Sequence, residues 1–129
     1  MLKTGILNPA IQSLLCRIRH TNTLVISDRG FPFWPQIETV DISLVDDIPR
    51  VLDVLKALSS NFAVARVFMA EEFLSVNQPE TLAAFAIALD RMPTTYEPHV
   101  ALKKRVPQAI GLIRTGDTTQ YANMVIESG

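Results

Sequence analysis

The chain has 129 residues, a formal net charge of −1, 48% hydrophobic and 19% charged residues, and a single cysteine. This length predicts one domain over residues 1–129, large enough to bury a core without a disulfide or a structural metal. The near-zero charge excludes the strongly basic surface of a nucleic-acid-binding protein, and no apolar run approaches the roughly 20 residues of a membrane-spanning helix. We therefore expect no nucleic-acid or membrane partner and a cytoplasmic location, with which a lone cysteine agrees.

The first predicted element is a helix over residues 9–19, since Asn8 is a suitable N-cap and Pro9 suits the first turn. Its apolar residues recur at helical spacing, and Cys16 falls among them, so we expect that thiol to be buried. Further helices are predicted from 46–49 to about 58, over 78–91 and over 99–105. Strands are predicted over 24–28, 37–42, 64–70, 94–97, 109–114 and 122–126.

Strands and helices alternate along almost the whole chain. This order predicts an α/β, three-layer, Rossmann-like fold, in which a mostly parallel sheet carries helices on both faces. The connection over residues 115–121 is too short for the helical crossover that parallel neighbours need. We therefore expect the last two strands to pair antiparallel at one edge of the sheet.

Motifs for several common chemistries are missing from the sequence. It has no cysteine pair, no His-x-x-x-His and no acidic calcium loop, so no metal site is expected. Its glycines form neither a dinucleotide-binding nor a P-loop pattern, and no nucleophile-elbow serine occurs. Glu71 and Glu72 follow a predicted strand. They could act as a catalytic pair, but adjacent helical side chains point about 100° apart, and such a pair more often caps the next helix.

What remains is a set of acid/base and hydrogen-bonding groups centred on imidazole. His20 and Asp28 flank a short apolar strand, and α/β proteins place their chemistry at strand ends. His99, Tyr121 and Asn123 lie far along the chain. Histidine exchanges protons readily near neutral pH, while carboxylate, phenol and amide groups bind sugar hydroxyls. Structural explanations remain open, since His20 could interact with the end of the first helix and Asp28 could cap a turn.

These residues occur in the order and spacing of the ribose pyranase and fucose mutarotase proteins of bacterial sugar operons, which the chain resembles over nearly its whole length. Each motif alone is weak, whereas the ordered set is specific. The matching pieces are His20-Thr21-x-Thr23-Leu24-Val25-x-x-Asp28-x-Gly30-x-Pro32, Asp41-x-x-Leu44-Val45 leading to Pro49, Ala70-Glu71-Glu72, His99, Ile113-Arg114-Thr115-Gly116 and Tyr121-Ala122-Asn123.

The resemblance implies a cofactor-free isomerase that interconverts ring forms of a free monosaccharide. The ribose branch interconverts pyranose and furanose forms, the fucose branch interconverts anomers, and the chain is more similar to the ribose branch. The resemblance makes His20 the proton donor. It assigns sugar binding to Asp28, His99, Tyr121, Ala122 and Asn123. It also implies a ring-shaped homo-oligomer, a decamer of two pentamers, with sites at subunit contacts.

Two departures from the family pattern keep other functions open. Asn22 stands where the ribose branch usually has aspartate, and Arg29 stands where a small residue is common. The alternatives are an L-fucose-type mutarotase, a non-catalytic sugar-binding or regulatory protein, and a purely structural module.

Geometry raises a separate question about the two ends of the first strand. At about 3.3 Å per residue, an extended segment from His20 to Asp28 would span about 26 Å, too far for both residues to contact one sugar. Either residues 20–23 fold back, or the two side chains meet through different subunits.

Overall fold

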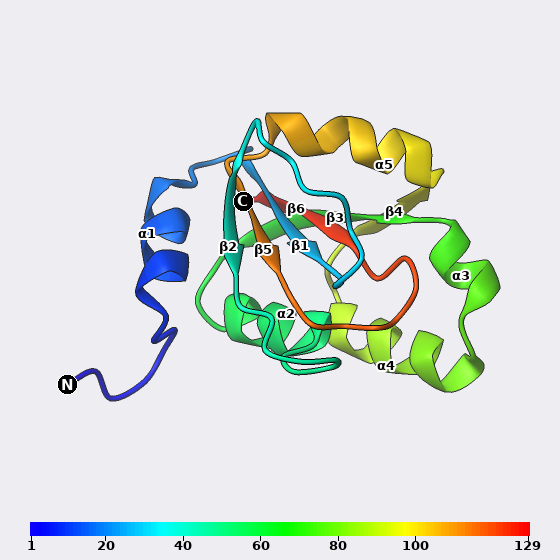
Figure 1. Ribbon diagram of the computed structural model, residues 1–129, viewed down its shortest axis with the longest axis horizontal. Coiled ribbons are helices and arrows are strands. Elements are labelled where there is room, and N and C mark those ends of the chain that lie inside the picture. Colours follow the sequence, from blue (N-terminus) through cyan, green and yellow to red (C-terminus); the bar gives the residue numbers. More distant parts are fainter.

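A six-stranded sheet forms the centre of the computed structural model, which describes residues 1–129. Its strands are β1 (Thr23–Ser27), β2 (Glu38–Asp41), β3 (Val64–Ala70), β4 (Thr94–Glu97), β5 (Gly111–Arg114) and β6 (Met124–Ser128). Their order across the sheet is β2-β5-β1-β6-β3-β4 (Figure 1). β6 is antiparallel to both of its neighbours, β1 and β3, and the other three pairs are parallel.

Helices cover both faces of this sheet and give the molecule three layers. They are α1 (Pro9–Arg17), α2 (Val51–Ser59), α3 (Glu72–Val76), α4 (Pro79–Leu89) and α5 (His99–Arg105), the last followed by a 3₁₀ turn. Figure 1 shows α5 on one side of the sheet and α2 with α4 on the other. Alternation along β1 serves both layers, because Leu24 and Ile26 join the core beneath α2 while Val25 joins the core beneath α5.

The predicted α/β class, the mostly parallel sheet and the antiparallel last strand are confirmed, but the position of that strand differs from the expectation. β6 lies inside the sheet instead of pairing with β5 at an edge. The reason is that residues 115–121 pass over the end of β1, so β6 is inserted between β1 and β3. The five-residue helix α3 was not predicted, because it is too short to show an apolar repeat.

The start of α2 also differs from the prediction, and the difference links two loops. The helix begins at Val51, whose N–H donates to Oδ2 of the buried Asp117 at 2.9 Å. Nearby, the Gly116 N–H donates to the Pro49 carbonyl at 2.9 Å, and the Asp47 N–H donates to the Gly116 carbonyl at 2.6 Å. The loop before α2 is thus bonded to the segment that leads into β6.

Cys16 is exposed, so the prediction of a buried thiol was wrong. α1 buries Ile11 and Leu14 against the core. Cys16 lies five residues beyond Ile11, which places it well away from that stripe at about 100° per residue. The sequence shows more apolar positions on this helix than the sheet covers.

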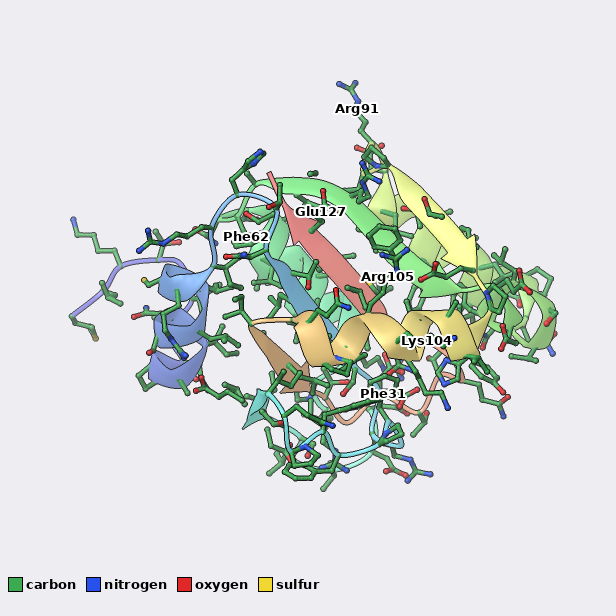
Figure 2. The ribbon with its side chains drawn as sticks, turned by 90° about the horizontal axis from the view of Figure 1, so that it is seen from above. Phe31, Phe62, Arg91, Lys104, Arg105 and Glu127 are labelled. Atoms are coloured by element: carbon green, nitrogen blue, oxygen red, sulfur yellow. The ribbon has the colours of Figure 1, made fainter.

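α5 is fastened to the sheet by a charged residue at its end. The Arg105 guanidinium lies 3.7 Å from the centroid of the Phe68 ring on β3 and pairs with Glu97 at the end of β4. Figure 2, seen from above, shows α5 lying across the sheet, with Arg91 projecting away from the body of the molecule. None of the helices combines the length and the apolar character needed to cross a membrane.

Candidate active site

The candidate site lies where the parallel strands end. Asp28 directly follows β1, and His99 follows β4 after a single proline. Because β6 runs the other way, its beginning reaches the same edge and brings Asn123 there. Residues from three distant parts of the chain therefore meet at the edge where open α/β sheets bind ligands.

A hollow of about 310 Å³ opens among these residues, which is at the small end of the range for ligand pockets. Its lining consists of Asp28, Gly30, Phe31, Pro32, His99, Gln120, Tyr121 and Asn123. Four of the predicted site residues are thus brought together: Asp28, His99, Tyr121 and Asn123. Five of the eight lining residues have side chains that can form hydrogen bonds with a small, hydroxyl-rich molecule.

Asp28 is held by its neighbours on several sides. Its Oδ1 accepts from the Gly30 N–H at 3.0 Å, and its Oδ2 accepts from Asn123 Nδ2 at 3.2 Å. Burial raises the pKa of Asp28, and the nearby Asp117 adds to the rise, while the hydrogen bonds from Gly30, Asn123 and Phe31 oppose it. The result is a fixed carboxylate that accepts hydrogen bonds and takes up a proton more readily than a free aspartate.

His99 is the first residue of α5 and forms one wall of the hollow. Its ring stands edge-on to Tyr121, with centroids 5.1 Å apart, and to Phe31, with centroids 6.1 Å apart. Burial lowers its pKa, Lys103 lowers it further, and Glu72 and Asp28 act in the opposite direction. At neutral pH the imidazole is therefore mostly neutral, and Nδ1 is buried without a hydrogen-bond partner.

Tyr121 and Ala122 reach the site through an unusual backbone turn. Tyr121 has φ 56, in the left-handed region that residues other than glycine rarely adopt. Ala122 is fully buried in the core beneath the hollow. Of these two predicted site residues, Tyr121 lines the hollow and Ala122 does not.

His20 is not part of the hollow. It is exposed and lies in the turn before β1, at the opposite end of the sheet from Asp28. That turn is fixed to the end of β6, because the Thr21 N–H donates to the Ser128 carbonyl at 3.0 Å and the Ser128 N–H donates to the Asn22 carbonyl at 2.9 Å. Since β1 is extended between the two residues, residues 20–23 do not fold back to the site.

The two departures from the family pattern also lie outside the hollow. Asn22 accepts from the Arg19 N–H at 2.9 Å and closes the turn that carries His20. Arg29 pairs with Asp46 at 2.7 Å and lines a separate hollow of about 440 Å³. The bulky Trp34 packs on Phe31 and the core beneath α5.

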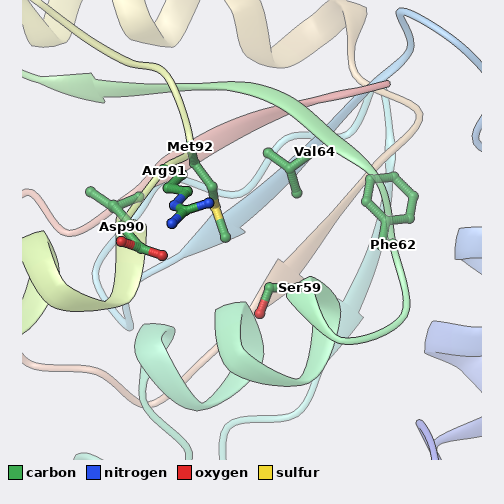
Figure 3. A pocket seen from close by; sticks show the side chains of 7 residues that line it. Ser59, Phe62, Val64, Asp90, Arg91 and Met92 are labelled. Carbon is green, nitrogen blue, oxygen red and sulfur yellow. The ribbon is translucent and has the colours of Figure 1, made fainter.

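Another hollow, of about 290 Å³, lies at the far end of β3 (Figure 3). Its lining is Ser59, Phe62, Val64, Leu89, Asp90, Arg91 and Met92. It contains none of the predicted site residues. No group of three or more His, Cys, Asp or Glu side chains is arranged to hold a metal ion.

The model of the RbsD / FucU transport protein family matches residues 1–129. The chain belongs to this family. Among its relatives, the D-ribose pyranase of Bacillus licheniformis is 38% identical over 100% of the chain and 98% of the relative. The D-ribose pyranase of Geobacillus kaustophilus is 36% identical over 100% of the chain and 94% of the relative. The family predicted from the ordered motifs is confirmed, and these relatives carry the name of the expected enzyme type.

Two solved structures share the fold of this chain. Bacillus subtilis RbsD complexed with D-ribose superposes with a TM-score of 0.91 at 30% identity, covering 100% of this chain and 98% of the other. The fucose mutarotase of Streptococcus pneumoniae in complex with L-fucose has a TM-score of 0.83 at 16% identity, covering 99% and 98%. The second likeness concerns the fold alone.

Some residues around the hollow were missed in the sequence. Phe31 and Gln120 line it, and Glu72 contacts the backbone of His99. Phe31 and Gln120 are next to motif residues in the chain, which was the available signal. The sequence shows Glu72 as one of two adjacent carboxylates. Its hydrogen bond to His99 could not be predicted, because the two residues are 27 positions apart in the chain.

Proposed function

We propose that the protein is a cofactor-free isomerase that interconverts the pyranose and furanose forms of free D-ribose. The observation that carries this proposal is the meeting of Asp28, His99, Tyr121 and Asn123 in one small polar hollow. The family's ordered motifs run through these residues, and full-length relatives are named D-ribose pyranase.

The proposed reaction requires only proton transfers. Ring opening needs a proton delivered to the ring oxygen and a proton removed from the anomeric hydroxyl, which gives the open-chain aldehyde. Closure from the hydroxyl on C4 instead of C5 then gives the furanose. No electrons leave the sugar, so proton transfers suffice, and each well-placed acid or base contributes about 10²–10⁴-fold.

In the proposed mechanism, Asp28 and Asn123 bind sugar hydroxyls, and neutral His99 accepts a hydrogen bond or a proton. The backbone of Ala122 and the phenol of Tyr121 complete the binding side. His20 is the proton donor, and a neighbouring subunit supplies it. Support for this arrangement comes from the exposure of His20 and from its position at the opposite end of the sheet.

This arrangement requires a homo-oligomer in which one copy gives its His20 turn to the hollow of the next. A heterologous contact closes into a ring when the rotation between neighbouring copies closes, and the proposed decamer of two pentamers contains two such rings. We place the reaction in the cytoplasm, a reducing compartment that suits the single cysteine.

The decisive experiment is saturation-transfer NMR on D-ribose with the purified oligomer. We expect faster exchange between pyranose and furanose signals, and slower or no acceleration of anomer exchange in L-fucose. If no common sugar exchanges faster, the proposal is wrong. Sugar binding without faster exchange would favour a binding or regulatory protein, a candidate supported by the lack of His20 in the hollow of a single chain.

A further inference from the structure

Glu72 is oriented toward the site, whereas its neighbour Glu71 is not. Both carboxylate oxygens of Glu72 accept from the backbone N–H of His99, at 3.0 Å and 3.1 Å. Glu71 is exposed, and its own N–H donates to the Glu97 carbonyl. The two carboxylates of this pair therefore have different surroundings, although they are adjacent in the sequence.

The N–H that Glu72 binds is one that α5 cannot satisfy by itself. The first amides of a helix have no partner within the helix. The preceding residue, Pro98, has no side-chain donor or acceptor, and no side-chain capping bond is made there. Figure 1 shows α3, which begins with Glu72, beside the end of α5 at which that helix starts. Glu72 thus replaces the missing cap from another element.

The bound amide belongs to the residue whose ring forms a wall of the hollow. The ring of His99 stands edge-on to Tyr121 and Phe31, and its backbone N–H is bound by Glu72. We propose that Glu72 is a positioning residue for sugar binding, which sets the place of the His99 imidazole by holding the first amide of α5. This inference rests on the proposed function, because it gives Glu72 a part in the sugar pocket.

The charges around His99 allow this role to be separated from simple support of the helix. The groups that face the imidazole are Lys103 on α5, Glu72 on α3, Asp28 after β1 and Tyr121 before β6. If α5 stays in place, loss of the Glu72 charge lowers the pKa of His99 further, because Glu72 acts to raise it. If α5 instead loosens, water reaches the ring and the pKa of His99 rises toward its ordinary value.

The test compares Glu72→Gln with Glu71→Gln in the full-length oligomer. Proton NMR of the His99 ring gives its titration without sugar, and D-ribose titration and exchange give affinity and rate. We expect E72Q to lower the pKa of His99 and to weaken ribose binding by about tenfold, the size of one charge-assisted hydrogen bond. The rate at saturating ribose should fall less than the affinity, and E71Q should match the wild type.

Unchanged titration and unchanged affinity in E72Q would overturn the inference, and a raised pKa of His99 would reduce Glu72 to a structural cap. A wild-type protein that does not accelerate ribose exchange contradicts the proposed function instead, and the sugar-free titration then still tests the link between Glu72 and His99. Should E72Q not fold, Glu72→Asp keeps the charge but shortens the side chain, and a loss of affinity smaller than tenfold is expected.

Discussion

Asn123 holds Asp28 at two points. Its Oδ1 accepts from the backbone N–H of Asp28 at 2.8 Å, and its Nδ2 donates to the carboxylate Oδ2 of Asp28 at 3.2 Å. Asn123 is nearly fully buried, with 3% of its surface exposed. One amide side chain therefore fixes both the position and the orientation of the carboxylate, and ties the end of β1 to the beginning of β6.

Replacing Asn123 should cost both stability and sugar binding. Asn123→Ala leaves the Asp28 N–H without a partner, so we expect a loss of about 1–3 kcal/mol in the free energy of unfolding. Urea unfolding measures this loss, and NMR titration measures ribose affinity. Gln120→Ala is the stability control, because Gln120 is exposed at the same hollow, and its effect should stay within about 0.5 kcal/mol. Equal effects of the two substitutions would contradict this account of Asn123.

A mixed oligomer can test whether His20 and Asp28 act across subunits. His20→Ala and Asp28→Asn should each abolish ribose exchange, because one lacks the proposed donor and the other lacks a sugar ligand. Co-expressed in equal amounts, they should restore about one quarter of the activity, since a random pairing joins an intact donor to an intact hollow at that frequency. Ribose exchange by NMR is the measurement. Mixed oligomers without activity would argue against a shared site.

The pH dependence of stability should contain a contribution from His99. Its pKa is lowered in the folded protein from the ordinary 6.5, so the unfolded chain binds more protons in this range. The contribution is complete above about pH 6.5 and is lost as the pH falls through the lowered folded value. Asp28 has the opposite sign, because its raised pKa makes the folded state gain stability as the carboxylate is protonated.

The corresponding measurement is the free energy of unfolding from about pH 8 to about pH 5. The free energy of unfolding of His99→Gln should decrease less on acidification than that of the wild type. Identical slopes for H99Q and the wild type would disprove the contribution of His99.

Gly116 occupies a place where no side chain fits. An added Cβ would collide with the Val45 carbonyl oxygen and lie 3.0 Å from that of Ile48. We expect Gly116→Ala to cost about 1–3 kcal/mol of stability through overpacking and to weaken ribose binding, since the same segment carries Tyr121.

Thermal unfolding and ribose titration measure the two effects of this substitution. Gly30→Ala is the control for stability, because the nearest atom to its added Cβ is Asp28 Oδ1 at 3.8 Å, an ordinary contact. An unchanged melting temperature in G116A would contradict this prediction. It would mean that the loop before α2 and the segment that leads into β6 can move apart without loss of stability.

Local signals in the sequence predicted most helices and strands. Asn8 is indeed the cap of α1, accepting from the Ile11 N–H at 3.0 Å, and the apolar run of 64–70 is β3. The pairing of strands was less predictable, because it depends on contacts between distant segments. The helix cap supplied by Asp117 is of this kind, since it lies 66 residues from the amide that it accepts from.

The candidate site was likewise predicted in part. The ordered motifs indicated Asp28, His99, Tyr121 and Asn123, and the fold brings these four together. Spacing along the first strand predicted that His20 and Asp28 lie far apart in an extended chain, but it could not decide whether residues 20–23 fold back, and the structure shows that they do not. For Cys16, helical spacing indicated a buried thiol, but packing against the sheet buries Ile11 and Leu14 and leaves Cys16 exposed.

The place of β6 in the sheet has a consequence for folding. β1 and β3 do not pair with each other but are joined by β6, which lies between them. The sheet therefore cannot be completed until β6 has left the ribosome. Until then, two groups of strands, β2-β5-β1 and β3-β4, each present an open edge, the kind of surface that promotes aggregation. A chain that ends before Met124 would therefore lose the middle of its sheet, and with it the connection between its two halves.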